Sequence, residues 1–234
     1  MPSHDRSEVA ISSSRDAELL AGFLRGVYGW MCGGLVITAV TAWAVASSPS
    51  IATAIFGNRL IFWAIVIAQF GIVITLSARV NRLAAGTASA LFIAYSALTG
   101  VTLSSVLLLY TGESVASTFV VSAGMFGALA MYGTLTQRNL SGVGQFLFMG
   151  LVGLVLASVV GMFWNNGGLQ FMISFVGVFV FAGLTVYDAQ RLKALALADG
   201  GSASAVTVVG ALVLYLDFIN LFLFLLRFLG GRRK

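Results

Sequence analysis

The chain has 234 residues, of which 59% are hydrophobic and 9% are charged, and its mean hydropathy is +0.99. Soluble domains are about 45–50% apolar and about 25% charged, so this composition excludes a water-soluble enzyme, a disordered regulator and a nucleic-acid-binding domain. The single cysteine, Cys32, excludes an internal disulfide, and the single histidine, His4, argues against a zinc hydrolase.

Taken in chain order, seven apolar runs are each long enough to cross a membrane as a helix, which takes about 20 residues. The runs cover residues 26–47, 60–78, 85–110, 114–136, 143–164, 169–190 and 206–229. Strands of a membrane barrel would alternate apolar and polar residues over about ten positions, and these continuous runs do not. The sequence therefore predicts an all-α integral membrane protein with seven transmembrane helices, bundled around the last one.

The predicted organisation has three parts: a polar N-terminal tail over residues 1–25, a seven-helix domain over 26–229 and a basic C-terminal tail over 230–234. Lysine and arginine number eight on the N-terminal side and five on the other, and the internal loops favour an N-terminus in the cytoplasm. The basic tail opposes this orientation. We expect the last helix to cross the membrane fully and to leave its tail on the outer side. The alternative is a re-entrant last helix, which would bring the tail back to the cytoplasmic side.

Asp217 lies in the middle of the seventh apolar run. An aspartate at that depth costs about 2.5–3.5 kcal/mol on the insertion scale. Such a residue is expected to face the bundle interior and to have a partner. Asn220, three residues further on, shares its helix face. The functional interpretation is an ion or proton site, and the alternative is a structural carboxylate that fixes helix packing.

Asp188, at the end of the sixth run, is the candidate partner, because both helices meet the loop over 190–205. Their predicted depths differ, since Asp217 lies about 11 residues into its run, or roughly 16 Å along the helix. If the carboxyl groups meet in a low dielectric, they cannot easily both ionise, so they would share one proton and titrate as a unit. Arg79 or Arg82, on the same predicted side, could then hold the pair as a latch; otherwise both are topology charges.

Several segments resemble the Bax inhibitor-1 family, and the most specific are Tyr187-Asp188-Ala189-Gln190 and the stretch from Leu214 to Phe222. Further matches are Val27 to Met31, Tyr95 to Gly100, Ala123 to Ala128, and the segment from Tyr132 to Ser141. The resemblance covers nearly all of residues 20–230, and the spacing is similar to that of the proteobacterial inner-membrane branch.

The resemblance implies a pH-sensitive calcium leak in the bacterial inner membrane, with no cofactor and with the lipid bilayer and calcium ions as partners of a monomer. In the family, an aspartate pair on the last two spans senses protons, and an arginine near the end of the second span latches it closed. Carried to this chain, the pair is Asp188 and Asp217, which with Asn220 would hold calcium transiently, and the latch is Arg79 or Arg82.

Two other classes of function were weighed. A bacterial relative in the family is tied to an AAA-class membrane protease, so the chain could be an interaction protein that restrains such a protease through its N-terminal tail. An enzyme is not expected. A retinal protein needs a lysine in the bilayer, and Lys193 and Lys234 lie outside the predicted spans. The Gly-x-Gly-Asp pattern of intramembrane aspartyl proteases is absent around Asp188 and Asp217.

Overall fold

The structure, a computed structural model, describes residues 3–164, 166–198 and 204–233. Within them, seven helices are long and apolar enough to cross a membrane, so the predicted all-α fold with seven transmembrane helices is confirmed. The elements are α1 (Ser3–Ala46), α2 (Pro49–Phe56), α3 (Arg59–Ala78), the short 3₁₀ helix η1 (Val80–Arg82), α4 (Ala85–Leu109), α5 (Gly112–Leu135), α6 (Ser141–Phe163), α7 (Gly167–Ala198) and α8 (Ser204–Leu229).

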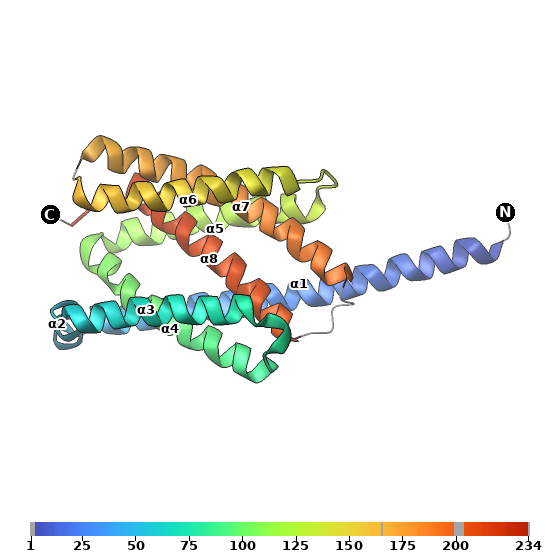
Figure 1. Ribbon diagram of the computed structural model, residues 1–234, viewed down its shortest axis with the longest axis horizontal. Coiled ribbons are helices and arrows are strands. Elements are labelled where there is room, and N and C mark those ends of the chain that lie inside the picture. Colours follow the sequence, from blue (N-terminus) through green and yellow to red (C-terminus); the bar gives the residue numbers. More distant parts are fainter. Residues whose placement is uncertain (1–2, 165, 199–203, 234) are drawn as a thin grey trace.

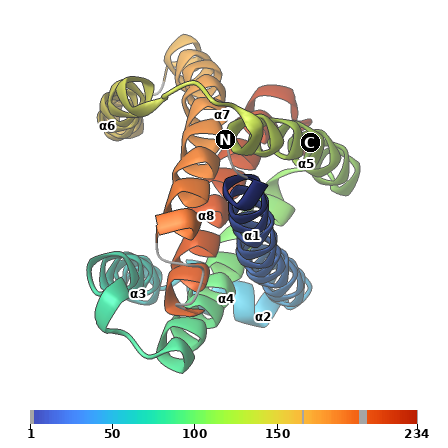
Figure 2. The same ribbon diagram turned by 90° about the vertical axis from the view of Figure 1, so that its right-hand side faces the viewer.

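The last helix, α8, is the centre of the bundle, as predicted. Two-thirds (67%) of its most apolar window is buried, compared with 6% for α3. In the end-on view α8 runs between α1, α4, α5 and α7, while α3 and α6 lie at the periphery (Figure 2). Because α8 extends the full length of the bundle, the chain termini lie at opposite ends (Figure 1), as full spanning of the last helix requires.

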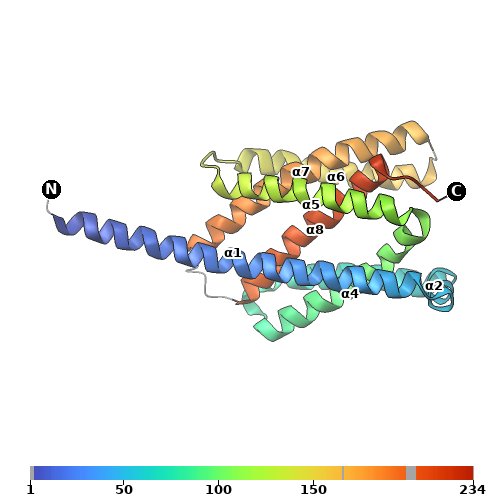
Figure 3. The same cartoon turned by 180° about the vertical axis from the view of Figure 1, so that it is seen from behind.

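Helix α1 is longer than the first predicted run. It continues without a break from Ser3 to Ala46 over 44 residues, or about 66 Å, and only Ala17–Ala46 is apolar enough to span a membrane. The helix therefore passes through the predicted boundary at residue 26, and its N-terminal part projects beyond the other helices (Figures 1 and 3). The sequence also did not predict α2, which begins with a proline, a residue suited to the first helical turn.

Helix α7 also extends beyond its predicted end at residue 190 and reaches Ala198. Arg191 and Lys193 follow the predicted end of the sixth run, but both lie within the helix. Lys193 is half-buried, and its Nζ donates a hydrogen bond to the carbonyl oxygen of Thr134 at 2.8 Å. Lys193 therefore lies within the helix that contains the sixth predicted span, three residues beyond the predicted end of that span. The corrected end changes the depth of Asp188.

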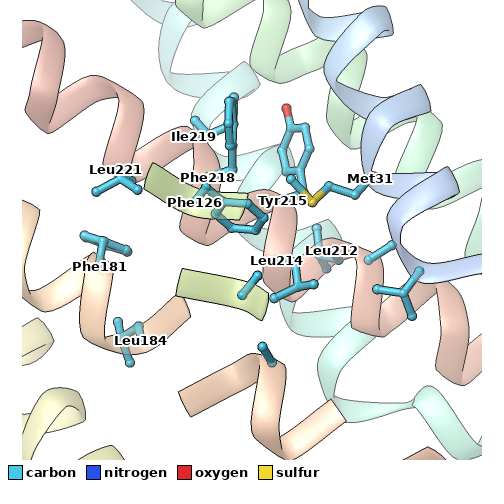
Figure 4. Packing of buried hydrophobic residues seen from close by; sticks show 14 of the residues in the cluster. Met31, Phe126, Phe181, Leu184, Leu212, Leu214, Tyr215, Phe218, Ile219 and Leu221 are labelled. Carbon is cyan, nitrogen blue, oxygen red and sulfur yellow. The ribbon is translucent and has the colours of Figure 1, made fainter. Parts of the chain in front are cut away.

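Aromatic and aliphatic side chains fill the space between α8 and its neighbours (Figure 4). Phe218 of α8 packs edge-on against Phe126 and Phe119 of α5, with ring centroids 5.5 and 5.4 Å away. Gly133 of α5 lets two backbones approach, because a Cβ atom there would overlap the carbonyl oxygen of Val186 on α7. These contacts hold α5, α7 and α8 together around the two aspartates.

The C-terminal tail pairs with the loop between α4 and α5. Tyr110 and Arg232 form an antiparallel bridge, and the Arg233 amide donates to the carbonyl oxygen of Leu109 at 3.0 Å. The tail is thus attached at the end of the bundle opposite the N-terminus of α1 (Figure 1). Lys234, part of the predicted basic tail, lies outside the described residues.

Candidate functional site

The structure brings Asp188 and Asp217 together. Asp188 projects from α7 and Asp217 from α8, and their carboxyl groups lie within side-chain hydrogen-bond reach of each other. Asp188 is half-buried, whereas Asp217 is only 4% exposed. Because both groups are acceptors when ionised, a hydrogen bond between them requires one shared proton.

The extended α7 explains how the two depths match. Asp188 lies ten residues before the end of α7 at Ala198, and Asp217 lies 13 residues after the start of α8 at Ser204. The two helices run in opposite directions from the same end of the bundle (Figure 1). The difference of three residues corresponds to about 4.5 Å at the helical rise, whereas the predicted runs place the two aspartates two and eleven residues from the loop, a difference of about 13.5 Å.

Both carboxyl groups line a cavity of about 900 Å³ between α3, α6, α7 and α8. One face of α6 forms a wall from Ser141 to Val159, and one face of α8 forms another from Val213 to Arg227. Residues at three- and four-residue spacing share a helix face, so one face of each of the two helices is turned toward the cavity. The cavity therefore extends along much of the length of the bundle.

Within this cavity Asp217 has an unsatisfied oxygen. Its Oδ2 atom is buried and has no hydrogen-bond partner among the described residues. A buried polar atom without a partner costs about 1–3 kcal/mol, and more if it is charged. The position is therefore suited to a proton, a cation or a water molecule.

The polar residues that line the cavity besides the pair include the amide Asn220 and two arginines. Asn220 lies on the Asp217 face, as predicted, and its Nδ2 donates to the carbonyl oxygen of Leu216 at 2.8 Å, which leaves its Oδ1 as an acceptor. Arg191 acts electrostatically on Asp188 from one helical turn further along α7. Arg227 lines the opposite end, with its guanidinium carbon 5.9 Å from the centre of the Phe224 ring.

The two predicted latch residues lie elsewhere. Arg79 ends α3 and Arg82 ends η1, both side chains are exposed, and neither lines the cavity. Helix η1 does contact α8, so this segment packs near the start of the helix that carries Asp217. The role of either arginine as a latch stays a prediction. Sequence analysis missed Arg191 as the cation beside Asp188, although its spacing of three residues from Asp188 was a usable signal.

A second polar cluster, also missed, lies on the opposite face of α8. The Tyr215 hydroxyl is 2.6 Å from Thr38 Oγ1 of α1, and Thr38 Oγ1 is 2.9 Å from the carbonyl oxygens of Gly34 and Ser96. Tyr215 is fully buried. Because successive residues on a helix turn by about 100°, Tyr215 and Asp217 point in nearly opposite directions. This cluster fixes α8 to α1 and α4 while its other face lines the cavity.

The cavity is a poor cage for a tightly held metal ion. Among the described residues, no three His, Cys, Asp or Glu side chains gather where they could hold one. Calcium takes six to eight oxygen ligands, and the pair with Asn220 offers fewer than that number unless water completes the set. The arrangement is suited to exchanging a proton for a cation rather than to storing a metal.

Comparison with known proteins agrees with this architecture. Residues 20–234 match the family model described as inhibitor of apoptosis-promoting Bax1. The chain is 49% identical over 218 residues to the inner membrane protein YbhL of Escherichia coli, covering 92% of this chain and 93% of that protein. An uncharacterized Borreliella burgdorferi protein is 46% identical over 91% of this chain and 93% of its own length. Uncharacterized protein YrjE of Lactococcus lactis is 34% identical, with 90% and 91% covered. This protein belongs to the Bax inhibitor-1 family.

Proposed function

We propose that the protein is a pH-sensitive calcium leak pathway of the bacterial inner membrane, controlled by the pair Asp188 and Asp217. The observation that supports this most strongly is the contact between the two carboxyl groups in the wall of the cavity, with Asp217 Oδ2 unpartnered. A carboxylate pair is an expensive feature inside a membrane, and its usual uses are ion pathways and proton relays.

The proposed switch exchanges a proton for calcium. At low pH one shared proton joins the carboxyl groups and removes their repulsion. When that proton leaves, two negative charges remain side by side, and an entering calcium ion relieves the repulsion. Asn220 Oδ1, backbone carbonyls and water complete a transient coordination shell. Because a proton and calcium compete for the same oxygens, the leak at low calcium concentration is expected to rise with pH.

Arg191 is the cation placed to modulate this exchange, since it lies beside Asp188 in the cavity lining. The latch role of Arg79 or Arg82 would act from outside the cavity, through the contact of η1 with α8. A latch of that kind predicts a higher basal leak after replacement of one of the two arginines by alanine, and not of the other.

We place the N-terminus in the cytoplasm, since the end of the bundle that holds it also carries Arg79, Arg82, Arg138, Arg191 and Lys193. This asymmetry follows the positive-inside rule. The inner membrane is the expected location, in agreement with the name of the Escherichia coli relative. We expect a monomer with no cofactor and no catalytic activity.

Calcium flux in liposomes tests the proposal. The purified protein is reconstituted into vesicles containing a calcium dye, and the leak rate is measured across a pH series. The wild type should show a pH-dependent leak, and Asp217→Asn should remove that dependence. Glu113→Gln is the matched control, because Glu113 lies in the first turn of α5 and does not line the cavity. A pH profile of Asp217→Asn that matches the wild type would contradict the sensor role.

The projection of α1 beyond the bundle favours one alternative function, binding and restraint of an AAA-class membrane protease (Figure 1). Removing residues 1–16 leaves the span-forming part of α1, Ala17–Ala46, intact. If the calcium proposal is right, the truncated protein leaks as before. If the protein instead acts on a protease through this segment, the truncated chain no longer protects a protease substrate in a reconstituted degradation assay, and neither protein leaks calcium.

A further inference from the structure

The cavity that Asp188 and Asp217 line is also open to the lipid-facing side of the bundle. Phe70 of α3 is 66% exposed, Phe148 of α6 is 62% exposed and Val155 of α6 is 54% exposed, yet all three line the cavity. These residues lie in the middle stretches of membrane-spanning helices, so the surface they form faces hydrocarbon. A lipid-soluble molecule could therefore reach the cavity between α3 and α6, which lie at the periphery (Figure 2).

All four helices around this opening contribute a phenylalanine to the cavity walls. Phe70 and Phe148 face the cavity from α3 and α6, and Phe181 and Phe224 face it from α7 and α8. The last two rings stack with centroids 5.7 Å apart. Aromatic faces attract organic cations. The volume of about 900 Å³ lies within the range of about 300–1,000 Å³ typical of pockets for small organic ligands.

Near the middle of the cavity, the two carboxyl groups, when ionised, carry one more charge than the nearby cationic side chains can neutralise. Its titratable lining groups are Asp188, Arg191 and Tyr187 from α7 and Asp217 and Arg227 from α8, while α3 and α6 contribute none. Arg191, exposed one turn further along α7, supplies one positive charge near Asp188, and Arg227 lies ten residues beyond Asp217, about 15 Å along the helix. The two carboxyl groups and the nearby arginine have no net charge only when the carboxyl groups share one proton. A single monovalent cation in place of that proton would leave the net charge at zero.

An organic cation satisfies the walls better than a metal ion does. A tightly held metal ion needs many oxygen ligands, and among the described residues no three His, Cys, Asp or Glu side chains gather to hold one. An organic cation needs only the carboxylates, and its apolar groups fill the aromatic part of the cavity. We propose that the cavity binds lipophilic organic monocations, which enter from the bilayer between α3 and α6 and lie beside the carboxyl pair in the cavity wall, where Asp217 Oδ2 has no partner among the described residues. The cation releases the proton shared by the carboxyl groups to water. This site uses the same carboxyl pair as the proposed leak but does not depend on calcium flux.

Binding of radiolabelled tetraphenylphosphonium to the full chain in nanodiscs tests this proposal, with empty nanodiscs as the measure of partition into lipid. Wild type should bind saturably, and Asp217→Asn should bind at least ten-fold more weakly. The control Glu113→Gln should bind like the wild type. Binding that does not saturate, or that is unchanged in a correctly folded Asp217→Asn, would overturn the proposal.

A pair of tryptophan variants on α6 separates this proposal from the calcium leak and decides the case if Asp217→Asn does not fold. Val155→Trp fills the apolar part of the cavity, whereas Val152→Trp places the same side chain at an exposed position that does not line it. Val155→Trp should weaken tetraphenylphosphonium binding at least ten-fold, and Val152→Trp should not. Equal binding by both variants would overturn the proposal. If the wild type binds tetraphenylphosphonium saturably but does not leak calcium, the result supports this inference and contradicts only the proposed calcium leak.

Discussion

Replacing Gly133 by alanine should disturb the helix pair that positions Asp188. The new methyl group would overlap the carbonyl oxygen of Val186, and it would lie 3.0 Å from the Val186 carbonyl carbon and from Ala189 Cβ. Comfortable carbon–carbon contacts are about 3.5–4.0 Å, so α5 and α7 must separate by roughly 0.5 Å or more. Two of the three contacts are backbone atoms, which cannot rotate away. Overpacking of this kind costs about 1–3 kcal/mol.

The matched control is Gly124→Ala on the same helix, where an added Cβ meets nothing within 4 Å. Both variants gain the same helix propensity, about 1 kcal/mol, so the difference between them isolates the overpacking cost. That difference corresponds to a Tm lower by about 2–12 °C in Gly133→Ala, measured by thermal unfolding in detergent. A Gly133→Ala protein as stable as the control would refute the close approach of α5 and α7.

Three further changes test other contacts of α7 and α8. A double-mutant cycle of Thr38→Val and Tyr215→Phe should give a coupling energy of about 0.6–1.7 kcal/mol by thermal unfolding, because their hydroxyls are 2.6 Å apart; zero coupling would contradict this hydrogen bond. Gln190→Ala should speed hydrogen exchange of the Leu140 amide, which donates to Gln190 Oε1 at 3.1 Å, and unchanged exchange would count against it. Removing residues 230–234 should speed exchange of the Thr111 amide, which donates to the Gly231 carbonyl at 3.2 Å, while the Leu140 amide serves as the unaffected reference.

The fold and two residues of the candidate site, Asp217 and Asn220, were predictable from the sequence for one physical reason, the free-energy cost of polar groups in hydrocarbon. Seven long apolar runs, whose only charged residues are Asp188, Asp217 and Arg227, leave little choice except seven spanning helices. Asp217 was found because a carboxylate in such a run is costly. Asn220 followed from its spacing on the same helix face, and the structure places both in the cavity lining.

The depth of Asp188 was harder to predict, because charges were taken as the end of α7. Arg191 and Lys193 did not end the helix, since the following alanine and leucine residues favour helix and carry it on to Ala198. A charge near a span end marks the membrane boundary and not the helix boundary. By the same reasoning, Arg191 falls outside the predicted span and is not expected to be a neighbour of Asp188, on which it acts in the structure.

The hydroxyl cluster around Tyr215 shows a second limit of sequence reasoning. Serine, threonine and tyrosine are common in spanning helices, and a hydroxyl can satisfy itself on its own helix backbone, as Ser96 does with the carbonyl oxygen of Phe92 at 2.9 Å. Hydroxyl side chains therefore do not carry the large free-energy cost in a membrane that marks a carboxylate, and the sequence does not single out Thr38 and Tyr215. Their pairing across 177 positions of the chain depends on the packing of α1 against α8.

The shared proton between Asp188 and Asp217 is the central claim, and infrared difference spectroscopy tests it most directly. The protein is held in lipid at neutral pH, where an isolated aspartate is ionised, and calcium is added while the carbonyl stretch of protonated carboxyl groups is recorded. The account predicts one protonated carboxyl in the wild type that disappears as calcium binds and releases a proton, and no such change in Asp217→Asn. A wild type whose carboxyl band is absent, or is insensitive to calcium, would contradict it.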